Sequence, residues 1–300
     1  MAPALRRLKP VESLAERIAR AFPAIGRAEP LRELGSGASG DVVETAEGIV
    51  VKVARIAGPT AAYEPEWRAL PVLALHLSVP VPHPRWRSLA GEVFPHGALA
   101  YAMLPGHTPP EQGSEGLARD LGSLLAELHG LPRSVAAEAG LPEWEPRARY
   151  LELRPAVMQD LAHRLTPAQH RRIDTWWDDF AGDPTFPATD RAICHHDVWH
   201  DNILVNEHGH LVAVLDWEHV DWSDPAHDLA PLLHFGEVFF DRAVSAYREA
   251  GGRYDDDIAH RVEWYWPARA LGGLSFSLRH ETEAEVLGQV RKVREIFFGS

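Results

Sequence analysis

The segment from residue 194 to residue 216 holds the side chains best suited to chemistry. Asp197 is followed five residues later by Asn202, which leads directly into an apolar run, Ile203-Leu204-Val205. After a turn, a second apolar run ends at Asp216, fourteen residues beyond Asn202. Mg²⁺ prefers a few protein oxygen ligands together with phosphate oxygens and water. We therefore expect a hairpin to bring Asn202 and Asp216 together as a Mg²⁺ site, with Asp197 ahead of it to orient a hydroxyl nucleophile.

A second group of candidates lies nearer the N-terminus and is suited to binding phosphate. A loop of glycine and serine lets the backbone approach an anion closely. This loop comprises Ser36, Gly37, Ala38, Ser39 and Gly40. Lys52 lies within a β-branched run, and an ammonium beside such a loop is a phosphate ligand. Glu66 on the next predicted helix is its candidate partner, with Glu64 in competition. Taken singly, these features also fit an ordinary hairpin turn and a half-exposed lysine.

The first hundred residues predict a small, mainly antiparallel sheet that would position Lys52 and the glycine-rich loop. Short apolar or β-branched runs alternate there with turns. The predicted strands cover residues 31–35, 41–46, 49–54, 85–89, 92–95 and 98–104. The spacing of apolar residues predicts helices over 12–22 and 62–77.

Beyond Pro105-Gly106 the pattern becomes mainly helical. Leucines at helical spacing follow Ser114, and further helices are predicted near 146–163, 167–181 and from 225 to the end. Two short strands, at 203–205 and 211–215, interrupt them. We expect an α+β fold of two lobes with a cleft between them. The predicted domains are a nucleotide-binding lobe at 1–104 and a catalytic and acceptor-binding lobe at 105–300.

These motifs resemble those of the aminoglycoside and macrolide phosphotransferases, which are protein-kinase-like small-molecule kinases. The catalytic-loop motif is matched by His195-His196-Asp197, four further residues, and Asn202-Ile203-Leu204-Val205. Two later motifs are matched by Asp216-Trp217 and by Asp224-Pro225-Ala226-His227-Asp228-Leu229-Ala230. The resemblance extends over about residues 30 to 250. It implies a two-lobed kinase-like fold and transfer of the γ-phosphate of ATP or GTP to a hydroxyl of an antibiotic, an aminoglycoside or a macrolide.

The resemblance also implies roles for single residues of the second lobe. Asp197 would be the catalytic aspartate, Asn202 and Asp216 would hold Mg²⁺, and Asp228 would brace the catalytic loop. The chain departs from the family pattern with a histidine, His196, in place of a glycine. It departs further where His200-Asp201 replaces Pro-Gly and Ser223 replaces glycine. None of these departures removes a chemical group that the reaction needs.

In the first lobe, the resemblance implies a nucleotide site. Lys52, paired with Glu66, would bind the nucleotide phosphates, and the loop of residues 36–40 would cover them. The backbone of a hinge would meet the nucleobase, at Ala102, Met103 and Leu104. Because such a hinge uses backbone atoms, the sequence does not distinguish ATP from GTP.

Acidic side chains are concentrated around the predicted catalytic loop. Residues 192–241 contain ten acids and no Lys or Arg, in a chain whose net charge is −13. Such a negative zone would attract a cationic acceptor, such as a polyamine or an amino sugar. The candidate contacts are Asp201, Glu218, Asp221 and Glu237. The alternative is that these acids are caps or solvated side chains. An acidic chain also lacks the basic surface that nucleic acids and anionic membranes require.

Three other functions stay open at this point. A metabolite kinase of the same fold would act on choline, homoserine or a sugar-like acceptor. A metal-dependent hydrolase would use Zn²⁺ ligands such as His195, His196, Asp197 and His200, but it leaves Lys52 and the Asn202–Asp216 spacing unexplained. A pseudokinase that binds nucleotide or drug without turnover is expected to lack Lys52, Asp197 or Asp216, and all three are present.

Length and composition are those of an ordinary globular protein. The chain has 300 residues, of which 45% are hydrophobic and 24% charged. No apolar run reaches the roughly 18 residues that span a bilayer. The single cysteine, Cys194, excludes an intrachain disulfide and fits a reducing compartment. We therefore expect a cytoplasmic protein, a monomer or homodimer, whose partner is a small molecule bearing a hydroxyl.

Overall fold

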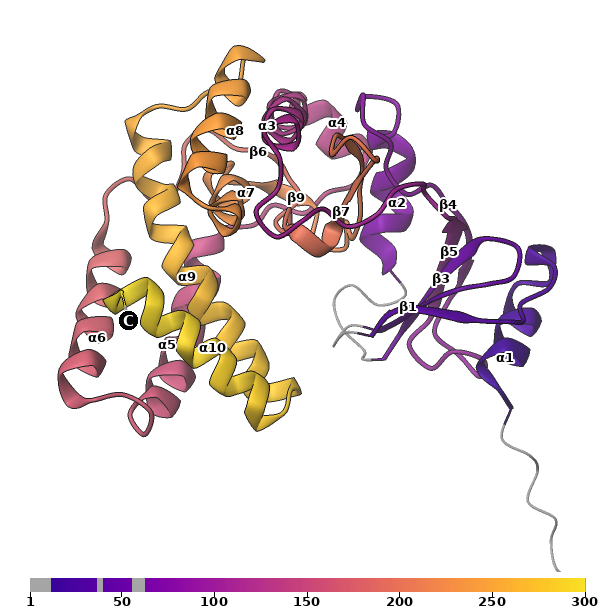
Figure 1. Cartoon of the computed structure of the whole chain (residues 1–300), viewed down its shortest axis with the longest axis horizontal. Coiled ribbons are helices and arrows are strands. Elements are labelled where there is room, and N and C mark those ends of the chain that lie inside the picture. Colours follow the sequence, from indigo (N-terminus) through magenta and orange to yellow (C-terminus); the bar gives the residue numbers. More distant parts are fainter. Residues whose placement is uncertain (1–11, 37–39, 56–62, 300) are drawn as a thin grey trace, which may run out of the picture. The chain divides into compact units, whose positions relative to one another are not determined.

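The computed structural model of the chain describes residues 12–36, 40–55 and 63–299 (Figure 1). By their contacts the residues divide into two compact units, the first made of 1–67 and 82–104 and the second of 68–81 and 105–300. The helix α2 (Glu64–Leu73) spans this division. Its second half belongs to the second unit because Leu70 and Leu73 are fully buried there, in a cluster with Leu124 of α3 (Glu115–His129). The chain therefore passes between the units at 67/68, at 81/82 and at 104/105, and the sequence predicts only the last of these three boundaries.

The first unit is built on a five-stranded antiparallel sheet in the order β1-β2-β3-β5-β4. Its strands are β1 (Arg32–Ser36), β2 (Gly40–Glu44), β3 (Ile49–Ala54), β4 (Pro84–Ser88) and β5 (Ala98–Ala102). Gly48, whose φ is 69°, makes the tight turn between β2 and β3. This turn sets the register in which Val42 pairs with Lys52. The predicted strands are confirmed to within a few residues, except the one at 92–95.

The segment 92–95 is a turn. The carbonyl of Phe94 accepts hydrogen bonds from the N–H groups of Gly91 and Gly97, so the chain folds around this residue. The Phe94 ring is fully buried and packs in one cluster with Ile18 of α1 (Leu14–Ala21), which a short turn, η1 (Pro23–Ile25), follows. Its apolar side chains made the segment look like a strand, although they serve the core from a turn.

Helices dominate the second unit. After α3 come α4 (Arg133–Glu138), α5 (Pro146–Leu161), α6 (Pro167–Gly182), α7 (Ala226–Leu229), α8 (Glu237–Glu249), α9 (Asp256–His280) and α10 (Glu283–Phe298). Strands β6 (Ala192–Cys194) and β9 (Asp221–Ser223) pair with each other, and β7 (Ile203–Val205) and β8 (Leu211–Val214) form the predicted hairpin. Two 3₁₀ turns, η3 (His200–Asn202) and η4 (Ala230–Phe235), complete the unit. Within it, α3 packs along α8, and α9 along α10 (Figure 1).

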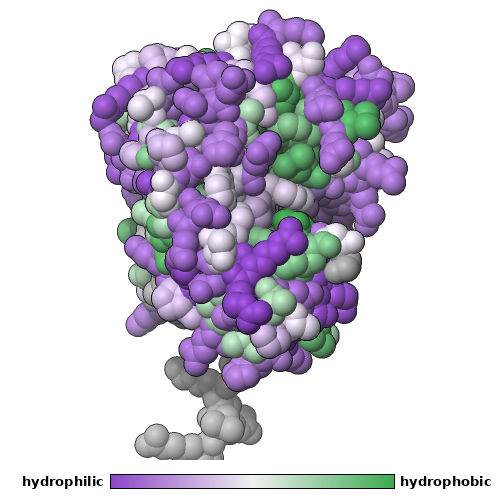
Figure 2. Space-filling model, turned by 90° about the vertical axis from the view of Figure 1, so that its left-hand side faces the viewer, coloured by the Kyte–Doolittle hydropathy of each residue, from purple (hydrophilic) through white to green (hydrophobic). Residues whose placement is uncertain are grey.

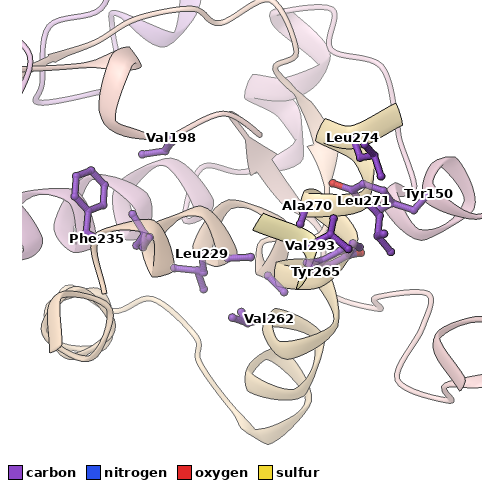
Figure 3. Packing of buried hydrophobic residues seen from close by; sticks show 14 of the residues in the cluster. Tyr150, Val198, Leu229, Phe235, Val262, Tyr265, Ala270, Leu271, Leu274 and Val293 are labelled. Atoms are coloured by element: carbon purple, nitrogen blue, oxygen red, sulfur yellow. The ribbon is translucent and has the colours of Figure 1, made fainter. Parts of the chain in front are cut away.

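The core of the second unit gathers around α9 (Figure 3). Tyr265, Leu271 and Leu274 of this helix are fully buried, and they share a cluster with Tyr150 of α5 and Val293 of α10. Burying a large apolar side chain stabilises the fold by about 1.5–3 kcal/mol. This packing fixes α9 and therefore the position of the polar side chains that it carries.

None of the described helices, including the 25-residue α9, is apolar enough over a sufficient length to cross a membrane. Figure 2 shows one face of the molecule, on which hydrophilic residues predominate and hydrophobic ones lie in small groups. Large hydrophobic side chains that are exposed come from different parts of the chain, among them Leu75, Leu89 and Val238.

Candidate active site

The loop after β6 carries Asp197 and is held by Asp228 of α7. The backbone N–H groups of His195 and His196 donate to the two oxygens of the Asp228 carboxylate, at 2.7 Å for His195. The ring of His129 in α3 lies 3.2 Å from the same carboxylate. Burial alone raises the pKa of Asp228, but the hydrogen bond from His129 and the charges of the neighbouring histidines outweigh it and hold the pKa below its ordinary value. An ionised carboxylate therefore fixes the backbone directly ahead of Asp197.

His196 has a backbone conformation that usually belongs to glycine. Its φ is 72°, in the left-handed region that costs a residue with a Cβ about 1–2 kcal/mol. Its buried ring compensates through hydrogen bonds: Nε2 lies 2.5 Å from Oδ1 of Asp221, and Nδ1 lies 2.7 Å from Nδ1 of His227. His227 Nε2 lies 2.8 Å from the hydroxyl of Tyr150. These hydrogen bonds of the buried ring allow a histidine to take the backbone conformation of the expected glycine.

Within this buried network, the pKa values of His196 and His227 are shifted in opposite directions. Burial alone lowers the pKa of His196, but the charge of Asp221 and the hydrogen bond to it outweigh burial and raise that pKa. Burial, followed by the charge of His196, holds the pKa of His227 well below its ordinary value. Burial also raises the pKa of Asp221, although His196 lowers it. Asp221, His196 and His227 thus form one buried hydrogen-bonded chain. Because Asp221 is only 5% exposed and engaged here, its position speaks against the acceptor contact predicted for it.

The carboxylate of Asp197 is partly open and is held on both sides. Nδ2 of Asn202 donates to Oδ2 at 2.8 Å and to the Asp197 carbonyl at 3.0 Å. Nη2 of Arg269, from α9, lies 3.3 Å from Oδ1, and its Nη1 donates to the carbonyl of His196 at 2.7 Å. The Asp197 side chain stays 33% exposed. A fixed carboxylate with one open side can receive a hydroxyl group.

The β7–β8 hairpin brings Asn202 and Asp216 to adjacent positions. The N–H of Leu215 donates to the carbonyl of Asn202 at 2.8 Å, and Asp216, with a φ of 63°, follows directly. The amide nitrogen of Asn202 is turned to Asp197, and no described residue donates to its Oδ1. A carboxamide oxygen beside a carboxylate is the type of donor pair that Mg²⁺ takes. The two residues therefore fit the ion that the sequence leads us to expect.

In the first unit, Lys52 of β3 and Glu66 of α2 form a buried ion pair. Lys52 Nζ lies 2.9 Å and 3.1 Å from the two carboxylate oxygens, and the side chains are 7% and 1% exposed. The ammonium also lies 4.7 Å from the ring centre of Tyr63. Glu64, the competing candidate, pairs with Arg87 instead. The predicted pairing is therefore present, and it holds the lysine in one position.

Three of the other residues predicted to meet the nucleotide, Ser36, Gly40 and Ala102, lie at strand ends of the first unit. Gly40 begins β2, and a Cβ at this position would collide with the carbonyl oxygen of Val53, so the position requires glycine. Ser36 ends β1, whereas Gly37, Ala38 and Ser39 lie outside the described residues. Ala102 ends β5 and is exposed, and Leu104 is half-buried. Their roles toward a nucleotide stay predictions.

The four acids predicted to meet an acceptor do not form one open acidic surface. Glu218 and Asp221 are buried, whereas Asp201 and Glu237 are exposed. Glu237 begins α8, where a carboxylate stabilises the helix terminus. Asp224, in the same acidic stretch, is buried in an ion pair with an arginine of α9. Much of the negative charge around the catalytic loop is therefore used inside the fold.

A family model decides the classification of the chain. The model of the phosphotransferase enzyme family matches residues 30–268. The chain belongs to the phosphotransferase enzyme family. This membership confirms the resemblance seen in the sequence motifs, and phosphotransferase is the enzyme class that the sequence predicts.

Relatives of this phosphotransferase include two curated proteins. YcbJ of Bacillus subtilis (strain 168) is 27% identical over 216 residues, which cover 71% of this chain and 66% of YcbJ. Viomycin phosphotransferase of Streptomyces vinaceus is 27% identical over 183 residues, which cover 60% of this chain and 61% of that protein. The match thus spans less than two thirds of each relative's own length.

Solved structures similar to this phosphotransferase confirm the predicted fold class. The GDP and kanamycin complex of an aminoglycoside phosphotransferase, APH(2″)-IIIa, has a TM-score of 0.81 at 19% identity and covers 93% of this chain and 96% of its own. Macrolide 2′-phosphotransferase type I has a TM-score of 0.70 at 24% identity and covers 94% and 97%. The fold is therefore the α+β fold of these enzymes, with a small antiparallel sheet and a larger helical part.

Sequence reasoning missed one residue of the phosphotransferase site, Arg269. It follows Asp197 by 72 residues, on a helix whose other buried side chains serve the core. No motif or spacing marks it, because only the packing of α9 brings it to the catalytic loop. An arginine among the buried apolar positions of a helix is the one signal that the sequence offered.

The zinc-hydrolase alternative gains no support from the structure. Over the described ranges, a single group of His, Cys and carboxylate side chains comes close enough to hold a metal ion, namely His129, Cys194 and Asp228. Asp228 already accepts the backbone hydrogen bonds of the catalytic loop. The four ligands considered from the sequence, His195, His196, Asp197 and His200, do not assemble into such a group.

Proposed function

We propose that this phosphotransferase moves the γ-phosphate of ATP or GTP to a hydroxyl of a small molecule, with Mg²⁺ as cofactor. The observation that carries the proposal is the carboxylate of Asp197, held by Asn202 and Arg269 and open on its remaining side. Such a carboxylate orients the acceptor hydroxyl and takes its proton as the new P–O bond forms. The bond between the γ-phosphorus and its bridging oxygen breaks, and the nucleoside diphosphate leaves.

The residues around Asp197 supply the metal ligands in this proposal. Oδ1 of Asn202 and the carboxylate of Asp216 would hold Mg²⁺, which when bound neutralises the charge on the phosphate oxygens. The backbone hydrogen bonds to Asp228 keep the loop rigid, so that little reorganisation is needed when substrates bind. Catalysis is then mostly a matter of positioning.

The first unit supplies the nucleotide site in this proposal. Lys52, fixed by Glu66, binds phosphate oxygens of the nucleotide. The loop that begins at Ser36 and ends at Gly40 covers the phosphates, and the backbone at Ala102 and Leu104 meets the nucleobase. The presence of Lys52, Asp197 and Asp216 favours turnover over a pseudokinase that only binds.

Two classes of small molecule are candidate acceptors for this reaction. The names of the relatives favour an antibiotic, because they are a viomycin phosphotransferase and aminoglycoside and macrolide phosphotransferases. The second candidate is a metabolite with a hydroxyl group. One observation favours it: a cavity of the second unit is lined by Arg291 and Lys292.

A phosphorylation screen tests the proposal. The purified protein is incubated with ATP or GTP, with Mg²⁺ or with a chelator, and with viomycin, aminoglycosides, macrolides, amino alcohols, hydroxy acids and sugars. We expect a phosphorylated acceptor by mass spectrometry, formed only with Mg²⁺. Failure of every acceptor to be phosphorylated from either nucleotide would contradict the proposal. Release of phosphate without any acceptor would identify a nucleotide hydrolase instead.

A further inference from the structure

A cavity of about 360 Å³ opens in the second unit between η4, α9 and α10. Its lining includes Leu233, His234, Trp266, Arg291, Lys292 and Glu295. Its lining mixes apolar with charged side chains, as sites for small ligands do. Its volume suits a molecule of the size of a sugar or a small metabolite.

The cavity lies beside the loop that carries Asp197. The ring of His234 packs 4.7 Å from that of Trp266 and 6.3 Å from that of Trp199, which follows Asp197 by two residues. Trp266 precedes Arg269 by about one turn of α9, and Arg269 contacts the Asp197 carboxylate. His234 and Trp266 of the lining therefore connect the cavity to the catalytic loop, through Trp199 and through Arg269.

The charged side chains of the lining are mainly basic, namely Arg291 and Lys292 against Glu295. Lys292 Nζ lies 3.3 Å and 3.5 Å from the two ring nitrogens of His234. No described carboxylate lies within ion-pair distance of Lys292 or Arg291, and Glu295 is the single acid in the lining. Burial, followed by the charges of Lys292 and Arg269, lowers the pKa of His234 to about 3, so its ring is neutral and adds no charge to the lining. The lining therefore has an excess of positive charge.

The guanidinium of Arg269 adds to this excess. Burial first, and then the charge of Arg269, lowers the pKa of Lys292, whereas the charge of Glu295 raises it. The Nε of Arg269 is buried and has no hydrogen-bond partner in the described part of the chain. The positive charge of Lys292 and Arg291 in the lining, with Arg269 behind Trp266, favours an anion and repels a cation.

We propose that this cavity receives the acceptor and selects a hydroxylated small molecule that carries an anionic group, such as a carboxylate, held by Lys292. This inference rests on the proposed phosphoryl transfer and names its acceptor class. It reverses the cationic acceptor predicted from the acidic stretch 192–241. Four of the ten acids of that stretch are buried, whereas the charged side chains that line the cavity come from α10, outside it.

Three compounds that share one sugar ring but are anionic, neutral or cationic test whether the cavity selects its ligand by charge. Glucuronate, glucose and glucosamine are titrated against the full-length protein by calorimetry, without nucleotide. We expect glucuronate to bind about tenfold or more tightly than glucosamine, which corresponds to about 1.4 kcal/mol. The substitution Lys292→Met should remove this preference, Lys292→Arg should keep it, and Arg171→Met, an exposed charge on α6, should leave it unchanged. Equal or tighter binding of glucosamine, an unchanged preference in Lys292→Met, or no binding of any probe would overturn the inference.

Lysine labelling provides a second readout that does not require turnover. The chain has three lysines, Lys9, Lys52 and Lys292, so an amine reagent followed by mass spectrometry reports each one separately. Glucuronate should protect Lys292 relative to Lys9, and glucosamine should not. Selective binding without phosphorylation of any acceptor would refute the proposed function and keep this inference. Phosphorylation of cationic acceptors with no protection of Lys292 would keep the function and refute the inference.

Discussion

Nη2 of Arg269 lies 3.3 Å from Oδ1 of Asp197, although the two residues are 72 positions apart in the chain. Nη1 of the same side chain donates to the carbonyl of His196 at 2.7 Å. The guanidinium therefore ties the catalytic loop to α9, which is fixed by the core of the second unit. Arg269 acts as a positioning residue for the carboxylate that we propose to receive the acceptor's proton.

The substitution Arg269→Gln should lower kcat about 10- to 100-fold, because a misplaced catalytic group costs up to about that factor. The KM for nucleotide should change little, since Arg269 contacts neither Asn202 nor Asp216 in the described structure. Steady-state kinetics with varied nucleotide separates the two constants. Arg279→Gln, further along α9, is the matched control and should retain activity. A rise in nucleotide KM at unchanged kcat would contradict the positioning role.

The substitution Asp228→Asn should destabilise the protein by about 1–3 kcal/mol, because two backbone N–H groups lose a charged acceptor. The folded-state pKa of Asp228 lies below its ordinary value of 3.8. Its contribution is therefore complete above that value and is lost as the pH falls through the folded-state pKa. Urea unfolding at pH 7 and at successively lower pH measures this. The difference between wild type and variant should shrink as the pH falls below about 4, and a constant difference would refute the assignment.

The substitution Asp221→Asn should reduce stability and leave acceptor binding unchanged. Asp221 is buried against His196, so the change alters one partner of a buried hydrogen bond and costs about 1–3 kcal/mol. Thermal unfolding and the acceptor KM distinguish the two effects. Glu237→Gln, an exposed acid at the start of α8, is the control; it should cost only the helix-terminus effect of about 0.3–1 kcal/mol and leave the acceptor KM unchanged. A raised acceptor KM in Asp221→Asn at full stability would restore the role predicted from the sequence.

The two glutamates at the start of α2 give a matched pair of variants. Glu66→Gln weakens the fixation of Lys52 and should raise the nucleotide KM by about tenfold, since a charge-assisted hydrogen bond contributes about 1.5–3 kcal/mol. Glu64→Gln removes only an ion pair with Arg87 and should stay within about twofold of wild type. Nucleotide titration of both variants checks this. Equal effects would show that Lys52 is positioned by other contacts.

The parts of the fold and site that could be predicted from sequence are those encoded locally. The spacing from Asp197 through Asn202 to Asp216 predicts the hairpin because strand pairing and turn lie within fifteen or so residues. The β-branched run around Lys52 predicts β3 for the same reason. The pairing of Lys52 with Glu66 could be predicted because strand β3 and helix α2 follow each other in the sequence.

The parts that could not be predicted depend on contacts between distant segments. Arg269 and Lys292 reach the site only through the packing of α9 and α10, which no local pattern encodes. The acidic stretch suggests an open negative zone, but sequence does not tell which acids face inward, and Asp221 and Asp224 do. His196 occupies a position with positive φ because Asp221 and His227 hold its ring, a compensation that only the tertiary structure reveals.

The most direct test of the central claim is the rate of phosphoryl transfer in the substitution Asp197→Asn, measured in a single turnover with saturating Mg²⁺ and nucleotide. The change keeps the shape of the side chain and removes its capacity to take a proton. We predict a loss of about 10²- to 10⁴-fold in this rate, with nucleotide affinity and thermal stability close to those of the wild type. A variant that transfers phosphate at nearly the wild-type rate would contradict the account.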